Sequence, residues 1–370
     1  MTQSGTPVPL CTLEARQLSV VLGGQKVLDI PSLQLFPDET LVIIGPNGSG
    51  KTTLLLCMAL LLRPTTGGIA FRGIPVEDGS SILRLRRRFA VVFQEPLLLD
   101  ATVWDNVTLG LRLRGVRREE TKARAREWLE QFSIASLAKR RAGTLSVGEA
   151  KRASLARAFA LQPEVLFLDE PFAALDGPTR QSLMEDLVGV LRETKVSTVM
   201  VTHDRNEALA LGNRVAVLMD GHIRQIGTPE EVFSFPVDEE VARFVDACNV
   251  LHGVVSSQSE GLASVSIGEQ QLYAVSSLAA GTKVAVYLHY EDVTISMATP
   301  QTVPSSARNQ LRGRIAKALP FASQMRVTVD CGFPLVSLIT RRSWSDLGLE
   351  VGQEVMASLK ASSIRLIPSL

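Results

Sequence analysis

The chain is poor in cysteine and almost without net charge. Its 370 residues include 4 cysteines that lie far apart, with no Cys-x-x-Cys pair, so neither a disulfide framework nor a cysteine metal site is predicted. Lys+Arg 39 against Asp+Glu 38 gives no basic field, so no nucleic-acid partner is expected. The longest leucine-rich run, residues 54–62, is well short of the roughly 20 residues that span a bilayer. We therefore expect a cytosolic protein without a signal segment.

A complete phosphate-loop pattern, G-x-x-x-x-G-K-T, stands between an apolar run, residues 41–44, and a helix-like stretch, residues 53–62. The backbone N–H groups of such a loop and the positive end of the following helix bind phosphate groups. Lys51 is expected to reach the β- and γ-phosphates of a nucleotide, and Thr52 to place its hydroxyl on Mg²⁺. The predicted nucleotide-binding residues are Gly45, Pro46, Asn47, Gly48, Ser49, Gly50, Lys51, Thr52 and Thr53.

Two acidic residues end a second apolar run, residues 165–168, far along the chain. Asp169 fits a carboxylate that holds Mg²⁺ directly or through water, and Glu170 fits a general base that polarises an attacking water. Gln94 is a candidate sensor of Mg²⁺ and of the γ-phosphate, and His203 a candidate to orient the water. Alone, either of these last two residues would be unremarkable, and each gains its meaning from the phosphate loop and the acidic pair.

The chain changes character about two thirds of the way along. Strand-like and helical segments alternate up to about residue 235, which predicts an α/β fold with a largely parallel core sheet. Thr228-Pro229-Glu230-Glu231 is typical of a helix start, and the region near Pro236 is the first expected seam. Beyond about residue 249, short alternating strands with Gly and Ser turns follow.

A weak internal repeat is present in this second part. Residues 249–255 are echoed by residues 309–315, and residues 281–295 by residues 352–366. We interpret the repeat as two small OB-like β-barrels in tandem, the second one longer because of an insert at about residues 340–347. Chance similarity between short β segments is the alternative.

Leu145-Ser146-Val147-Gly148-Glu149 precedes a helix and lies some way ahead of the acidic pair. Here the chain resembles the nucleotide-binding subunit of ATP-binding-cassette (ABC) transporters, whose signature reads L-S-G-G-Q. The resemblance covers about residues 13–235, including the phosphate loop, Gln94, the acidic pair, the turn at residues 174–176 and His203. It implies a P-loop NTPase cassette with a helical subdomain.

The resemblance also implies an assembly. Two such subunits form a head-to-tail dimer that sandwiches two ATP molecules with Mg²⁺, and Ser146 and the N–H of Gly148 would bind the γ-phosphate of the partner's nucleotide. Expected partners are two integral-membrane permease subunits and an extracytoplasmic substrate-binding protein, with this chain peripheral at the cytoplasmic face of the membrane. The expected domains are an ATP-binding domain at residues 1–238, with its helical and signature subdomain at about 95–160, a linker at 239–248, and barrels at 249–300 and 301–370.

The chain departs from the family pattern in three places. Val147 replaces the first glycine of the signature, which adds a β-branched side chain where backbone approaches nucleotide closely. Glu149 replaces the usual Gln, as in some oxyanion-importer ATPases. The adenine-stacking aromatic residue expected before Gly23 is Leu22, which offers apolar contact with less stacking energy.

The second part resembles the molybdate-binding Mop, or transport-associated OB-type, module. A divalent oxyanion requires several N–H and O–H donors and a compensating cation. The candidate oxyanion residues are Ser306, Ala307, Arg308, Lys360 and Ser362. In the first barrel, His289-Tyr290-Glu291-Asp292 stands at the place of Lys360 to Ser363, and its two acids would repel a dianion.

The sequence therefore predicts the ATP-hydrolysing subunit of an importer for molybdate or tungstate. The alternatives are the same architecture serving sulfate, ferric iron, a polyamine or a sugar, and a soluble ABC ATPase outside transport. A barrel without any anion site, which only stabilises a dimer, is also compatible with the residues of the second part.

Overall fold

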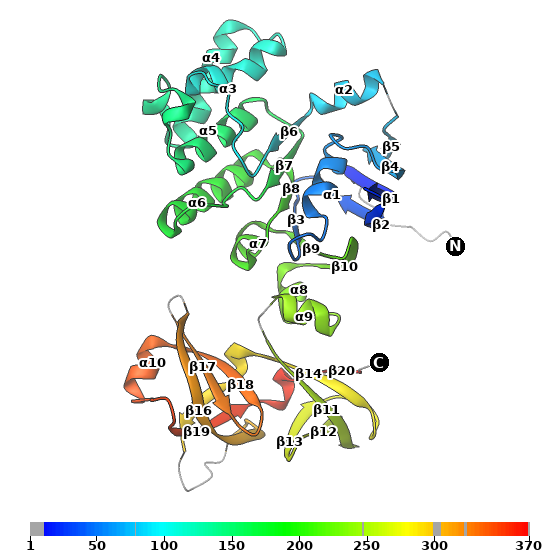
Figure 1. The fold of residues 1–370 in the computed structure, drawn as a ribbon, viewed down its shortest axis with the longest axis vertical. Helices are drawn as coiled ribbons and strands as arrows, with labels where there is room; N and C mark the ends of the chain where they lie inside the picture. Colours follow the sequence, from blue (N-terminus) through cyan, green and yellow to red (C-terminus); the bar gives the residue numbers. More distant parts are fainter. Residues whose placement is uncertain (1–10, 78, 246–247, 299–304, 322–323, 369–370) are drawn as a thin grey trace, which may run out of the picture. The chain divides into compact units, whose positions relative to one another are not determined.

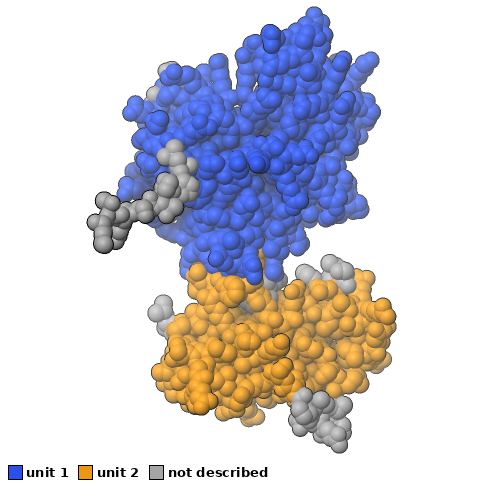
Figure 2. Space-filling view, turned by 180° about the vertical axis from the view of Figure 1, so that it is seen from behind, with its two compact units in different colours: residues 1–232 blue, residues 233–370 orange. Residues whose placement is uncertain are grey.

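The computed structural model describes residues 11–77, 79–245, 248–298, 305–321 and 324–368. The chain divides into two compact units, residues 1–232 and 233–370 (Figure 2). No helix within the described residues is both long and apolar enough to cross a membrane.

The core of the first unit is a six-stranded sheet in the order β10-β9-β3-β8-β7-β6. Strands β9, β3, β8, β7 and β6 are parallel, and β10 is an antiparallel edge strand. Strands β3, β7 and β8 are buried at every position, as expected for strands covered on both faces. The strands are β3 Thr40–Ile44, β6 Phe89–Val92, β7 Val165–Asp169, β8 Ser197–Val201, β9 Arg214–Met219 and β10 His222–Gly227.

An antiparallel sheet in the order β2-β1-β4-β5 completes the β-structure of this unit. Its strands are β1 Leu13–Leu22, β2 Gln25–Leu35, β4 Thr66–Phe71 and β5 Ile74–Pro75. Apolar side chains of β1, β2 and β4 share one core with those of α1 (Lys51–Met58) and of the parallel sheet. Helix α1 thus lies against two sheets, which fixes the loop in front of it.

Helix α1 is shorter than the sequence indicates. A helix over residues 53–62 is expected, but α1 ends at Met58. Leu60 has a left-handed φ of 61°, and the N–H groups of Leu61 and Leu62 both bond back to Leu56 O, at 2.8 and 3.1 Å. The chain therefore turns away within the leucine run, where periodicity gives no stop signal.

Five other helices of the first unit fall into two groups (Figure 1). Helices α3, α4 and α5 lie together within residues 95–160, where Trp128 of α4 stacks on Phe159 of α5 with ring centroids 5.0 Å apart. Helices α6 and α7 follow β7 and β8. The bounds are α2 Ser80–Arg86, α3 Val103–Leu113, α4 Arg118–Gln131, α5 Val147–Ala160, α6 Gly177–Thr194, α7 Arg205–Leu211 and α8 Pro229–Ser234, with short 3₁₀ turns at Ala135–Leu137 and Ala142–Thr144.

The second unit contains two five-stranded antiparallel sheets, in the orders β13-β12-β11-β14-β20 and β15-β19-β16-β17-β18. The last strand of each half pairs in the sheet of the other half: β15 with β19, and β20 with β14. One hydrophobic core is shared by both sheets. The elements are β11 Cys248–Ser259, β12 Leu262–Ile267, β13 Gln270–Val275, β14 Lys283–His289, β15 Thr294–Met297, β16 Asn309–Phe321, β17 Gln324–Asp330, β18 Pro334–Thr340, α10 Arg341–Asp346, β19 Glu354–Leu359 and β20 Arg365–Pro368, with 3₁₀ turns at Tyr290–Asp292 and Ala361–Ser363.

This exchange of strands corrects the expected domain plan. The two halves repeat one another as the sequence indicates, but they are not two barrels in series, because each sheet is completed by a strand from the other half. The boundary expected between residues 300 and 301 lies outside the described residues. The expected linker, residues 239–248, contains helix α9 (Glu239–Val245), and Ala242 packs on Ala285 and Tyr287. A short amphipathic helix next to a seam gives little periodic signal.

Two buried asparagines hold the halves together in the same way. Asn249 of β11 accepts from Val336 N at 2.6 Å and donates to Val336 O at 2.9 Å. Asn309 of β16 accepts from Tyr273 N at 2.7 Å and donates to Tyr273 O at 2.9 Å. Each amide therefore reaches from the middle strand of one sheet to the edge strand of the other, and each satisfies both polar groups of a residue there.

We expect Asn309→Leu to loosen this connection. The substitution leaves the N–H and C=O of Tyr273 without their partner, which costs about 1–3 kcal/mol per buried unsatisfied group. Hydrogen exchange of β13 should therefore accelerate in the intact chain, while Gln258→Leu, which replaces an exposed amide on β11, should leave exchange unchanged. Equal exchange of β13 in Asn309→Leu and the original chain would contradict the role given to this amide.

Candidate active site

The phosphate loop joins the carboxyl end of β3 to α1, and its backbone has a shape that suits phosphate groups. Gly48 and Gly50 have φ values of 82° and 98°, where residues with a side chain are strained. A Cβ on Gly45 would lie 2.0 Å from a carbonyl oxygen of β9. Helix α1 begins without a side-chain cap, so its first N–H groups are available to an anion. The hydroxyl of Ser49 is buried and has no hydrogen-bond partner among the described residues.

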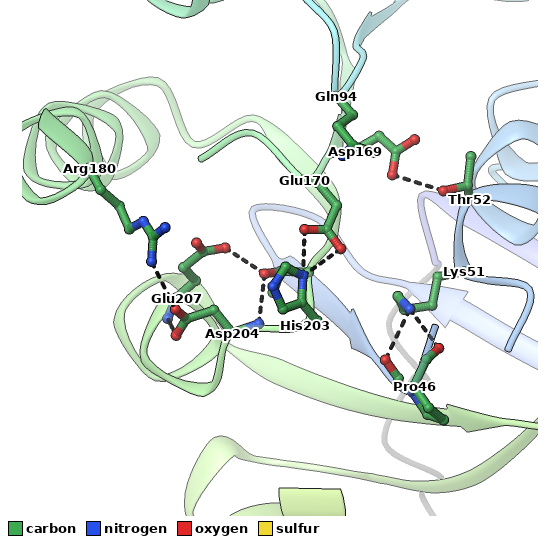
Figure 3. Close-up of polar contacts among 12 residues, drawn as sticks. Pro46, Lys51, Thr52, Gln94, Asp169, Glu170, Arg180, His203, Asp204 and Glu207 are labelled. Atoms are coloured by element: carbon green, nitrogen blue, oxygen red, sulfur yellow. Dashed lines mark hydrogen bonds and ion pairs between the residues drawn. The ribbon is translucent and has the colours of Figure 1, made fainter. Parts of the chain in front are cut away.

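Lys51 is the first residue of α1, and its side chain reaches back to the start of this loop (Figure 3). Its ammonium group is buried and donates to Gly45 O and Pro46 O, each at 2.9 Å. Burial lowers the pKa of Lys51, and the nearby carboxylates of Glu170 and Asp169 partly offset that shift. The loop thus holds a cation on two neutral carbonyl groups, which phosphate oxygens can replace as stronger acceptors.

Thr52 and Asp169 are far apart in the sequence but lie next to one another at the edge of the sheet. Thr52 Oγ1 donates to Asp169 Oδ1 at 3.1 Å (Figure 3). Burial raises the pKa of Asp169, whereas the bond from Thr52 lowers it. A hydroxyl and a buried carboxylate are the hard oxygen donors that Mg²⁺ prefers, so the donor set fits the metal that the sequence implies.

Glu170 and His203 form the second polar pair of the site. The distance from His203 Nδ1 to Glu170 Oε2 is 2.7 Å (Figure 3). Glu170 directly follows β7 and has a left-handed φ of 46°, and its N–H donates to Val201 O of the neighbouring strand at 2.9 Å. This backbone geometry, uncommon for a residue with a side chain, points the carboxylate at the edge of the sheet where His203 follows β8.

The predicted residues therefore gather at one edge, with some exceptions. Because the carboxyl ends of parallel strands meet there, the phosphate loop, Asp169, Glu170 and His203 are brought together. Gln94 follows β6 at the same edge and is exposed. Leu22 ends β1 and is 47% exposed. No hydrogen bond within the described residues joins Ser146 or Gly148 to the phosphate loop.

The signature segment forms the start of helix α5. Ser146 Oγ accepts from Glu149 N at 3.2 Å, and Glu149 Oε2 accepts from Ser146 N at 2.7 Å. This capping box gives Glu149 a role in helix formation. Gly148 faces α6, because a Cβ there would lie 2.7 Å from Thr179 Cγ2. Val147 is 52% exposed, so its side chain is accommodated at the helix start and faces solvent.

Comparison with known proteins identifies the family. A family model described as ABC transporter matches residues 28–173, and one described as TOBE domain matches residues 305–366. A molybdate/tungstate import ATP-binding protein from Pyrococcus horikoshii is 36% identical over 332 residues, covering 89% of this chain and 92% of the relative. The chain belongs to the ABC transporter family. It is an ABC-type ATPase that couples ATP hydrolysis to import.

Other relatives of this ATPase differ in substrate. A sulfate/thiosulfate import ATP-binding protein from Burkholderia mallei is 33% identical over 364 residues, covering 96% of this chain and 99% of the relative. A spermidine/putrescine import ATP-binding protein from Lawsonia intracellularis is 35% identical over 313 residues, covering 84% and 83%. A solved dimeric ATP-binding cassette bound to ADP and Pi is 29% identical with a TM-score of 0.54, covering 59% of this chain and 98% of that one. The predicted cassette fold and importer class are confirmed, and the soluble alternative is not supported.

Two buried charged residues near the site were not predicted from the sequence. Lys151 of α5 donates to Gln94 O at 2.6 Å and to Glu170 O at 3.1 Å. Glu207 of α7 accepts from Thr202 Oγ1 at 2.5 Å. In the sequence, each is a single charged residue in a helix. It can be identified as buried only when the side of the helix that faces the core is known.

We expect Glu170→Gln to remove turnover while retaining ATP. The amide keeps the shape of the carboxylate but cannot accept a proton from water. Hydrolysis should fall to background, and equilibrium binding of ATP should persist. Lys51→Ala, as a contrasting variant, should lose ATP binding as well, because it removes the cation on the phosphates. Unchanged hydrolysis in Glu170→Gln would remove the proposed role as base.

The carboxyl group of Glu207 predicts a pH effect on stability. Burial raises its pKa from 4.5 to about 7, against the bond from Thr202, which lowers it. The folded state therefore holds the proton more tightly than the unfolded state, so the stability due to this group is present at low pH and is lost as pH rises from about 4.5 to about 7.

Glu207→Gln should abolish that loss, because Gln does not ionise. The difference in unfolding free energy between variant and original chain should grow by roughly 3 kcal/mol over this range. Denaturant unfolding of the first unit at several pH values measures it, with the exposed Glu193→Gln as the control that removes one carboxylate without effect. If the difference in unfolding free energy between the variant and the original chain does not change with pH, the pKa of Glu207 is not raised in the folded state.

Proposed function

We propose that this ATPase energises the import of a tetrahedral oxyanion, with molybdate or tungstate as the first candidates. Support comes from the relatives that cover most of the chain and from the basic segments of the second unit. The same proposal places the chain in a homodimer at the cytoplasmic face of a membrane, with two permease subunits and an extracytoplasmic binding protein. Its near-zero net charge gives no support to a nucleic-acid partner.

The geometry of the first unit suits hydrolysis of ATP. Lys51 would exchange its loop carbonyls for phosphate oxygens, and Glu170 would accept a proton from the attacking water, with His203 orienting the pair. Mg²⁺, held by Thr52 and Asp169, would supply charge neutralisation on the phosphates. Ser146 and Gly148, at the start of α5, would contact the nucleotide of a second subunit.

The observation that carries the oxyanion proposal is a strand register. Asn309 of β16 pairs with Leu359 of β19, so the segment just before β16 and the segment just after β19 leave the sheet side by side. The first holds Ser306, Ala307 and Arg308, and the second holds Lys360 and Ser362. The guanidinium of Arg308 lies 5.4 Å from the centroid of the Tyr273 ring. Two neighbouring segments from distant parts of the sequence thus carry two cations and two hydroxyls, which supports a shared anion site.

The related turn of the first half has the opposite charge. Glu291 and Asp292 lie in the 3₁₀ turn after β14, where the second half has the turn after β19 that follows Lys360. Their carboxylates would repel a dianion, so only the second half is a candidate site. The same basic residues disfavour a cationic polyamine, while sulfate stays the strongest rival because it is also a tetrahedral dianion; nothing here favours ferric iron or a sugar.

Titration of the intact chain with anions tests this proposal. Tungstate and molybdate should bind more tightly than sulfate, and spermidine should not bind. Loss of one charge-assisted hydrogen bond costs about 1.5–3 kcal/mol, so Lys360→Ala should weaken binding by about tenfold or more. Ser306→Ala should weaken it less, and Lys317→Ala, an exposed lysine of β16, should have no effect. If neither anion binds, the second unit carries no oxyanion site and the substrate assignment is withdrawn, whereas ATP hydrolysis is unaffected.

A further inference from the structure

One face of the signature helix holds the segment that follows β6. Three polar side chains of α5, spaced three residues apart, donate to backbone carbonyls of that segment. Lys151 bonds to Gln94 O at 2.6 Å, Ser154 to Pro96 O at 3.4 Å, and Arg157 to Pro96 O at 2.9 Å and Leu97 O at 3.0 Å. These four hydrogen bonds attach the segment of residues 94–97 to α5.

Lys151 differs from the other two residues because it makes a second bond, to the catalytic segment. Its side chain is 1% exposed, and its ammonium donates to Glu170 O at 3.1 Å. Burial lowers the pKa of Lys151, and the nearby carboxylates of Glu170, Glu207 and Asp169 oppose that shift. A buried cation on neutral acceptors is unfavourable compared with an apolar side chain of similar size, so packing alone does not account for this lysine.

The carbonyl that Lys151 holds belongs to a strained residue. Glu170 has a φ of 46°, and its peptide groups are fixed by three bonds: its N–H to Val201 O at 2.9 Å, and its carbonyl from Lys151 and from Ala173 N at 3.1 Å. Strained backbone persists only where the surroundings over-determine it. Loss of one of the bonds would let the Glu170 peptide rotate, and the carboxylate with it.

We propose that Lys151 is a positioning residue that ties the start of the signature helix to Gln94 and to Glu170 and so sets the carboxylate for attack by water. This inference rests on the proposed role of Glu170 as base. Gly148 lies three residues before Lys151 on the same helix. A nucleotide of a second subunit that contacts the start of α5 therefore acts on a helix that is hydrogen-bonded to the backbone carbonyl of Glu170. Engagement of the partner's nucleotide is thereby linked to hydrolysis at the subunit's own site.

The test compares turnover and ATP affinity in variants of the intact chain. Lys151→Met keeps the length and apolar stem of the side chain and removes its donors, so kcat should fall by about tenfold to a hundredfold, the range for a slightly misplaced catalytic group. The equilibrium dissociation constant for ATP should stay unchanged, because Lys151 does not contact the phosphate loop. Lys151→Gln retains N–H donors and should recover most of the lost turnover.

Arg157→Met is the matched control, because it removes bonds to the same segment without touching Glu170. Its kcat should fall much less than that of Lys151→Met. Unchanged turnover in Lys151→Met overturns the proposal, as does a parallel loss of ATP binding and turnover that Lys151→Gln does not repair. If Lys151→Met fails to fold, Lys151→Gln decides alone: near-original turnover supports the proposal and a large loss overturns it. Glu170→Gln tests the role of Glu170 as base separately from the positioning role of Lys151. If that variant still hydrolyses ATP, Glu170 is not the base and the positioning role of Lys151 has no basis.

Discussion

Parallel alignment of the central strands is the constraint on which the ATPase site depends. Strand β8 pairs in parallel with β3 on one side and with β7 on the other. The segments that follow these three strands therefore leave the sheet at a single edge. The phosphate loop, the acidic pair and His203 are separated by long stretches of chain, and only this pairing brings them within hydrogen-bond distance of one another. The strands are buried on both faces, as expected for parallel strands in an α/β fold.

Two buried lysines lie at that edge of the sheet and carry its positive charge on different elements. Lys51 lies in the phosphate loop and Lys151 in the signature helix, and the carboxylates of Asp169 and Glu170 contribute to the electrostatic field at both. Both ammonium groups donate to backbone carbonyls and not to carboxylates. The acids consequently keep their oxygen atoms for Thr52 and for His203, and an incoming phosphate finds a cation that is bound only to neutral groups.

The second unit has no central parallel sheet among its described residues and is built from two similar halves that share one core. Its two halves repeat the same strand order, exchange their final strands and are joined by Asn249 and Asn309 through equivalent bonds. The repeat does not extend to charge. Glu291 and Asp292 stand in one half where the other half has Lys360 and its neighbours, so a duplicated scaffold carries one basic turn and one acidic turn.

The sequence by itself determined the class of the protein, because its chemistry depends on short local patterns. A phosphate loop between a strand and a helix, an acidic pair after an apolar run, and a signature segment are each legible within about ten residues. The change from an α/β to a β pattern and the internal repeat are also visible in the sequence, the repeat because short segments in the two halves match one another. Several features escaped it: the end of α1 at Met58, the helix at residues 239–245, and the exchange of β15 and β20.

The tertiary structure decided the rest, because pairing and burial involve residues that are distant in sequence. Whether β15 completes its own sheet or the opposite one depends on edge hydrogen bonds that any alternating strand can make. Likewise, Lys151 and Glu207 are ordinary charged residues until the faces of α5 and α7 are turned toward the core. An ammonium group becomes a connection between two loops only when folding removes it from water and leaves backbone carbonyls as its acceptors.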